Sequence, residues 1–192
     1  EPYPETRTGA GRVNPLMAID TPVIAADAAA PDRVSLSFGL LEISGSYMVK
    51  RNIDLSNMGS QPWVGTIVVS NTLANAGVTL APATPKVSVP AKGRVTVELT
   101  LTIDPAKVQL VFDPTTPPEV KGGPRHIAHE ASGQVWFHGE SRSVHVPYHM
   151  LLRLVGDHRV EVGSVEVRQR EGVAPVVLPV VGNNPHSAPL VS

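Results

Sequence analysis

Histidine offers the most conspicuous chemistry in this chain, because five of its seven histidines fall between residues 126 and 149. Neutral imidazole is a common ligand for zinc and nickel. His126 and His129 have the spacing to chelate one ion from a single helical turn, with Glu130 beside them. The five residues are His126, His129, His138, His145 and His149.

The surroundings of these histidines favour ordinary polar roles. His126 and His129 lie in a stretch rich in proline and glycine, where a helix is disfavoured, and no H-E-x-x-H motif occurs. His145 and His149 share one face of a predicted strand but lie about 13 Å apart, too far to bind one ion. We therefore predict hydrogen-bonded or solvated histidines, with no metal and no cofactor. The alternative, a zinc site, would raise the melting temperature on metal addition.

Carboxylates and hydroxyl groups form no catalytic pattern. A glycosidase needs two carboxyl groups that flank the substrate. The candidate carboxylates, Asp54, Glu98, Glu161 and Glu166, lie on polar faces of predicted strands, where solvated charge is the default. No G-x-S-x-G nucleophile motif is present. We therefore predict no catalytic residue in this chain.

Composition points away from nucleic acid and membrane partners. The formal net charge is −1, no run of Lys or Arg exceeds two residues, and aromatic residues make up 4% of the chain. The most apolar stretch, 173–181, is short and interrupted by Pro175 and Pro179, so we expect no membrane span. The chain has no cysteine, which excludes disulfides, cysteine-ligated zinc and a cysteine nucleophile.

Alternation of apolar and polar residues is the main structural signal. In residues 94–103, Val97, Leu99 and Leu101 point to one face and the intervening polar residues to the other, as in an antiparallel strand with one buried face. The 19 prolines and 16 glycines suit short strands joined by turns. Predicted strands cover 34–38, 47–56, 63–69, 86–89, 94–103, 133–138 and 141–150.

These seven strands predict an all-β fold, an antiparallel two-sheet β-sandwich of the fibronectin-III or immunoglobulin type. Trp63 is expected between the sheets. Arg51 is the one charged residue on the apolar face of its strand. The last two strands form a hairpin with Gly139-Glu140 as a two-residue turn, which places Val135 opposite Val144.

The two ends of the chain differ from this pattern. Asn14 as N-cap and Pro15 at the first helical position predict a helical turn or two over 13–20, followed by an extended linker. Asp104 and Pro105 predict a second short helix in the same way. Beyond the sandwich, valine-rich alternation predicts the start of a further β domain.

Several segments, taken in order, resemble one region of one family. Thr8–Asn14 resembles the segment that follows the nucleophile helix in subtilisin-like serine peptidases. Val34–Gly39, Ile53–Gly59, Val89–Gly93 and Val146–Tyr148 resemble successive parts of the fibronectin-III-like domain of large secreted subtilases. Asp20–Val23 and Ala131–Val135 fit the same order. The resemblance covers about residues 8–153.

The resemblance implies three segments: the end of a catalytic domain and a linker over 1–32, a fibronectin-III-like domain over 33–153, and a linker with the start of another β domain over 154–192. It implies a secreted parent peptidase, whose catalytic domain and protein substrates are the expected partners of this region. The family motifs D-[ST]-G, H-G-T and G-T-S are absent, so this chain is expected not to be catalytic. The alternative is a cell-surface adhesion or ligand-binding sandwich.

Trp136 is predicted to face outward on its strand. A large exposed aromatic residue often marks a contact surface. On this interpretation its nearest candidate partner is the catalytic domain to which residues 1–20 would belong. Cover by the proline-rich loop 113–132 is the alternative. Without its catalytic domain, the N-terminal segment is expected to be mobile or swapped onto a neighbour.

Overall fold

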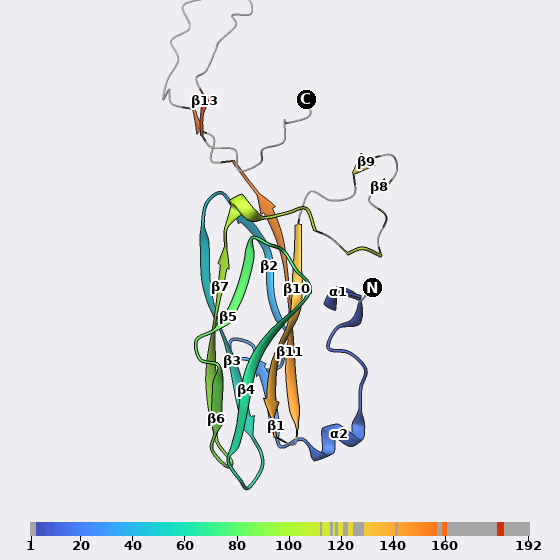
Figure 1. Cartoon of the computed structure of the whole chain (residues 1–192), viewed down its shortest axis with the longest axis vertical. Helices are drawn as coiled ribbons and strands as arrows, with labels where there is room; N and C mark the ends of the chain where they lie inside the picture. Colours follow the sequence, from blue (N-terminus) through green and yellow to red (C-terminus); the bar gives the residue numbers. More distant parts are fainter. Residues whose placement is uncertain are drawn as a thin grey trace, which may run out of the picture.

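The computed structural model shows two β-sheets packed face to face (Figure 1). One sheet has the strand order β1-β3-β7-β5, and the other has the order β2-β11-β10-β4-β6. This arrangement confirms the predicted two-sheet β-sandwich. The structure describes residues 3–111, 113–115, 117, 119–120, 123–124, 129–140, 142–156, 159–160 and 180–182.

The four-stranded sheet follows the period-2 pattern closely. In β7 the side chains of Leu99, Leu101 and Ile103 are fully buried, whereas the threonines between them face away from the core. The pattern analysis missed β5, which is short and bounded by loops. The strands of this sheet are β1 (Val23–Asp27), β3 (Tyr47–Asn57), β5 (Val78–Pro82) and β7 (Arg94–Ile103).

The five-stranded sheet contains one parallel pair, β2 with β11, although an antiparallel sandwich was predicted. β1 and β2 are consecutive in the chain but belong to different sheets, and β2 is the edge strand beside β11, paired from Leu36 opposite Tyr148 to Ile43 opposite Leu154. The strands are β2 (Leu36–Ile43), β4 (Trp63–Leu73), β6 (Lys86–Val89), β10 (His129–Gly139) and β11 (Ser143–Leu154).

The segment predicted as a linker is the edge strand β1. It pairs antiparallel with β3 from Val23 opposite Asn57 to Asp27 opposite Ile53. Val23, Ala25 and Asp27 are buried, so the period-2 pattern is present. Alanine has a low strand propensity, and the pairing partner therefore decides the conformation.

A partly buried ion pair explains the charged residue on the apolar face of β3: Asp27 is buried and Arg51 is half-buried. Nη2 of Arg51 lies 2.9 Å from Oδ2 of Asp27, at the end of β1. The guanidinium carbon of Arg51 also lies 5.8 Å from the ring centroid of Phe38, within the range of a cation–π contact. Arg51 therefore links β1 and β2, which belong to different sheets, to β3.

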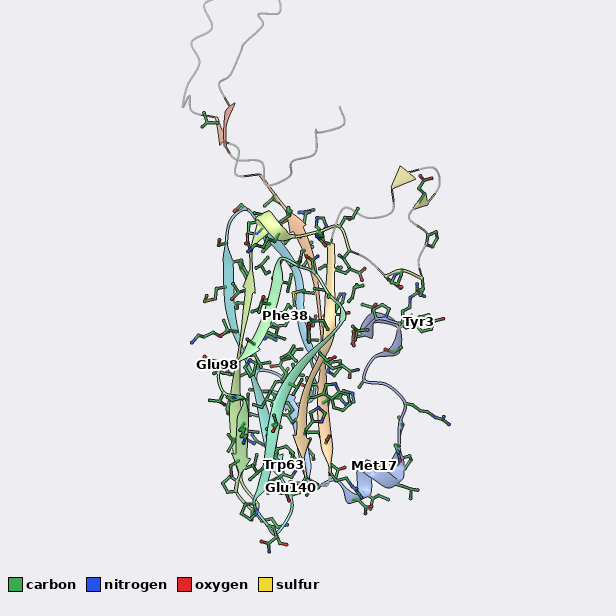
Figure 2. All side chains as sticks on the ribbon, viewed as in Figure 1. Tyr3, Met17, Phe38, Trp63, Glu98 and Glu140 are labelled. Atoms are coloured by element: carbon green, nitrogen blue, oxygen red, sulfur yellow. The ribbon has the colours of Figure 1, made fainter. Side chains whose placement is uncertain are left out.

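Trp63 is buried in the core cluster, as predicted. Figure 2 shows it beside Glu140, at the hairpin end of the sandwich. Its indole lies over Gly65 and Gly139, which are opposite each other on β4 and β10. A Cβ atom at Gly139 would lie 2.6 Å from Nε1 of Trp63, so this ring position requires glycine.

The β10–β11 hairpin has a different register from the predicted one. Val135 lies opposite Val146 rather than Val144, and pairing continues to Gly139, whose N–H donates to the Arg142 carbonyl oxygen (3.1 Å). The turn therefore comes one residue later. Because the strands shift by two positions, the predicted inward face is preserved.

Several short elements lie outside the two main sheets. The second predicted helix is a 3-10 turn, η1 (Pro105–Lys107), whose N-cap Asp104 accepts from the Ala106 N–H (3.1 Å). β10 begins at His129, inside the predicted loop. The two short antiparallel pairs are β8 (Glu119–Val120) with β9 (Gly123–Pro124), and β12 (Arg159–Val160) with β13 (Val180–Val181). Among the described residues, no helix is long and apolar enough to cross a membrane.

Candidate functional site on the outer face of the five-stranded sheet

Residues 3–22 form an N-terminal arm that lies along the outer face of the five-stranded sheet, beside β10 and β11 (Figure 1). The arm contains two short helices, α1 (Glu5–Thr8) and α2 (Pro15–Asp20). The predicted cap of α2 is confirmed, because Asn14 Oδ1 accepts from the Met17 N–H (3.1 Å).

Among the described residues, four hydrogen bonds that involve a side chain hold the arm on the sandwich, whereas a mobile or swapped arm was expected. The contacts join the arm to β4, to the segment before β10, to β11 and to the β10–β11 hairpin. They are Glu5 with Thr72 (2.6 Å), Arg7 with Asp113 (2.6 Å), the Ala10 carbonyl oxygen with His145 Nε2 (2.9 Å), and Asp20 with Arg142 (3.3 Å). The outer face of the sheet thus supplies partners for the polar groups of the arm.

The Arg7–Asp113 contact is expected to release only in strong acid. Thr115 donates to Asp113 from its hydroxyl group (2.6 Å) and from its N–H (2.8 Å). These hydrogen bonds, the hydroxyl one foremost, together with Arg7 lower the pKa of Asp113 from 3.8 to about 2. Because the folded pKa lies below the unfolded one, the carboxylate stabilises the docked arm above about pH 4, and this contribution is lost as the pH falls through about 2.

An NMR titration of the Arg7 Nε–H signal checks this expectation. The signal should shift with a midpoint near 2 rather than near 3.8. The variant Asp113→Asn should abolish the shift, because it removes the titrating group. A wild-type midpoint near 3.8 would show that Arg7 and Thr115 do not hold the carboxylate in solution.

Trp136 faces outward, as predicted, within a group of aromatic rings. Its indole stacks on His138 (centroids 5.3 Å apart, interplanar angle 4°) and is tilted against His145 (4.3 Å, 35°). His145 in turn reaches the arm at Ala10. Two histidines flank the indole, and the arm anchors one of them.

The histidines do not converge on a metal site in the part of the chain that the structure describes. His138 Nδ1 lies 3.2 Å from Ser143 Oγ, and His145 is bound to the arm. No group of three His, Cys, Asp or Glu side chains among these residues could hold a metal ion. His126 lies outside the described residues, so the predicted absence of a metal stays a prediction.

A second polar group lies beneath α1. Ser132 and His149 are directly opposite each other on β10 and β11, on the same face as Trp136. Glu5 of α1 and Glu130 of β10 are each more than nine-tenths buried. Four buried polar atoms have no hydrogen-bond partner among the described groups: Oε2 of Glu5, Oε2 of Glu130, Oγ of Ser132 and Nε2 of His149.

This group does not have the geometry of a serine hydrolase site. A serine nucleophile must donate its hydroxyl proton to the neighbouring imidazole. Ser132 is completely buried, and its Oγ makes no hydrogen bond to His149. Burial lowers the pKa of His149, and the nearby Glu130 and Glu5 oppose this effect only in part. The imidazole is therefore neutral at neutral pH.

A cavity of about 350 Å³ opens beside this group, between the arm, the start of β2 and β11. Glu5, Gly9 and Ala10 line it from the arm, with residues 34–37 and 147–149 on the sandwich side. Sequence reasoning noted His149 only as a metal candidate and missed Glu5. No local pattern could have found Glu5, since its hydrogen-bond partner Thr72 lies 67 positions away.

Comparisons with known proteins do not assign a family to this chain. No family model and no curated protein matches the sequence. Solved structures with a similar fold include the CooA pilin subunit of enterotoxigenic Escherichia coli (13% identity, 70% of this chain and 99% of that chain, TM-score 0.41).

The structures of two proteases from Vibrio cholerae are also similar to this chain. The VesB protease has 10% sequence identity and a TM-score of 0.37, and the match covers 72% of this chain and 33% of that chain. The secreted serine protease VesC has 13% sequence identity and a TM-score of 0.37, and the match covers 60% of this chain and 21% of that chain. At these sequence identities and TM-scores, the similarity concerns the β-sandwich and assigns no activity to this chain.

Proposed function

We propose that this chain is a non-catalytic accessory β-sandwich of a secreted subtilisin-like serine peptidase, which supports the catalytic domain and positions protein substrates. The observation that carries the proposal is the ordered set of resembling segments. The segment that resembles the end of the catalytic domain, Thr8–Asn14, lies in the arm. The segments that resemble the fibronectin-III-like domain, such as Ile53–Gly59 and Val89–Gly93, lie in strands of the sandwich or at their ends.

In this proposal the arm joins the two domains. The apolar side chains of α2 and the residues before it point away from the sandwich: Val13, Leu16 and Ile19 are about four-fifths exposed (83%, 78% and 81%). Figure 2 shows Met17 on the same part of the arm. A catalytic domain would bury these side chains, and the contacts of the arm with the sheet would then fix its orientation relative to the sandwich.

The domain division is proposed with one adjustment. Segments 1–32, 33–153 and 154–192 remain the proposed parts, but Val23–Asp27 belongs structurally to the sandwich sheet. The coding sequence before Glu1 tests the proposal. A Gly-Thr-Ser nucleophile motif is expected within roughly 100 residues upstream, less than one typical domain length. Its absence from the reading frame would refute the subtilisin link.

The purified chain is expected to lack peptidase activity. It should neither hydrolyse casein nor react with a fluorophosphonate probe, because Ser132 is buried without a hydrogen bond to a base. The parent peptidase, under the same conditions, should be labelled. Labelling of this chain that disappears in Ser132→Ala would contradict the non-catalytic assignment.

A ligand-binding sandwich at a cell surface is the second candidate function. The cavity beside Glu5, with its unpartnered buried polar atoms, is the observation that favours it. Glycan arrays and pull-down on cell-wall material test this function. Specific retention would support it, and clean negatives in both assays would count against it.

A further inference from the structure

The N-terminal arm docks on the sheet with little apolar burial. Among residues 3–20 only Pro4 and Glu5 are buried, and all the others are exposed. Apolar burial supplies most of the favourable free energy when one surface packs on another. The arm therefore depends on its hydrogen bonds with the sandwich, and each of these contributes little when water competes for the same groups. The docked and released states of the arm are thus expected to lie close in free energy.

Two buried polar atoms at the contact of α1 with the sheet have no hydrogen-bond partner among the described groups. They are Oε2 of Glu5, on the arm, and Nε2 of His149, on β11. α1 contacts β11, and Glu5 and Thr6 line the same cavity as Pro147 and His149. A buried polar atom without a partner costs free energy, and water would reach this contact if α1 lifted. The contact therefore opposes docking of the arm.

His149 makes this contact sensitive to pH. Burial lowers the pKa of His149 below its ordinary 6.5, and Glu130 of β10 and Glu5 of α1 oppose this effect only in part. Ser37, opposite on β2, carries no charge, and burial raises the pKa of the neighbouring Tyr148, so its phenol stays neutral. Once α1 has lifted, the imidazole titrates near its ordinary pKa. Docking is therefore strongest above about pH 6.5 and weakens as the pH falls from there toward the lower pKa of the docked form.

Two other contacts of the arm persist in mild acid. Asp113 keeps its charge down to about pH 2, because its pKa is lowered, so its ion pair with Arg7 remains. His145 donates from Nε2 to the Ala10 carbonyl oxygen, and a protonated ring donates in the same way. Proton uptake by His149 therefore shifts the balance between docked and released arms, by at most about tenfold per pH unit.

We propose that the arm is an acid-released strap: mild acidification lifts α1 from the outer face of the five-stranded sheet while the β-sandwich stays folded. The sandwich stays folded because the buried apolar residues of its core lie in the strands and not in the arm. Release also frees His145, whose ring lies against Trp136. The inference is independent of the peptidase proposal, because both sides of the contact belong to this chain.

Spin-label distance measurements on the full chain test the release. The chain has no cysteine, so Val13→Cys and Val64→Cys give two unique labelling sites, both exposed and neither in the lining of the cavity beside His149. A docked arm gives one narrow distance distribution, and a released arm adds a broad one. The ratio of released to docked chains is expected to rise at least about twofold, and up to about tenfold, between about pH 7.5 and 5.5. A smaller change would overturn the proposal.

His149→Gln identifies the titrating group. Glutamine takes up no proton in this range, so the ratio of released to docked chains should stay within about twofold over the same pH interval. His138→Gln is the matched control, because His138 is exposed on the same hairpin and does not line the cavity. This control should keep the wild-type rise. A rise that survives in His149→Gln would refute the proposal.

Hydrogen exchange of the wild-type chain covers the case in which His149→Gln does not fold. The Gly9 N–H donates to the Glu5 carbonyl oxygen within α1 (2.8 Å), and a helix this short does not persist once it is released. Its protection should fall by about two- to tenfold between about pH 7.5 and 5.5, after correction for the intrinsic exchange rate. The N–H groups of Leu99 and Leu101 in β7 should keep their protection. Unchanged protection of Gly9, or an equal loss in β7, would overturn the proposal.

Discussion

Asp27→Ala is expected to lower the free energy of unfolding by about 2–3 kcal/mol, because it removes a charged hydrogen bond to the half-buried Arg51 and a second one to the Ala29 N–H. Asp27 is 4% exposed, and its carboxylate accepts from Arg51 Nη2 (2.9 Å) and from the Ala29 N–H (3.0 Å). Alanine would leave the guanidinium group against Phe38 without its counter-ion. Loss of the Ala29 hydrogen bond would also loosen the end of β1.

Urea unfolding followed by circular dichroism measures this loss. Asp54→Ala is the matched control, because Asp54 lies on the outer face of the neighbouring β3 with a longer ion pair to the exposed Arg94 (3.6 Å). That control should cost less than about 1 kcal/mol. The double variant Asp27→Ala/Arg51→Met should regain part of the stability, since it removes the unpaired charge. If Asp27→Ala costs no more than Asp54→Ala, the ion pair does not stabilise the fold.

Gly65→Ala is expected to destabilise the sandwich by about 3 kcal/mol, since overpacking a core displaces its side chains. A Cβ atom at this position would lie 2.6 Å from Cζ3 of Trp63 and closer still to Cη2. The edge of the indole that carries Nε1 already lies close to Gly139, where an added Cβ would be 2.6 Å from Nε1, so the ring has little room on that side. The strand or the ring must therefore shift.

A double-mutant cycle separates this clash from a general effect of alanine on a strand. Trp63→Ala alone should cost about 3–5 kcal/mol. In that background, Gly65→Ala should cost less than about 1 kcal/mol, because the ring it would strike is gone. Gly45→Ala is the control, as nothing lies within 4 Å of its added Cβ, and it should change stability by about 0.5 kcal/mol or less. An equal cost of Gly65→Ala in both backgrounds would contradict the contact.

The sequence alone determined the elements whose signals are local. Alternation over 94–103 and 86–89 predicted strands with the bounds that β7 and β6 have. Asn14 and Pro15 predicted the start of α2, because a cap involves neighbours three positions apart. The inward face of β11 and the burial of Trp63 followed from the same period-2 pattern.

Tertiary structure decided the features that depend on a distant partner. β1 is alanine-rich and becomes a strand because β3 pairs with it. Arg51 is stable on an inner face because its guanidinium group donates to the carboxylate of Asp27, 24 positions away. The cavity joins Glu5 to His149, residues from the two ends of the described fold. Alternation records which face of a strand is buried. It does not record which strand, ion or arm covers that face, because such contacts depend on the position of residues far apart in the chain.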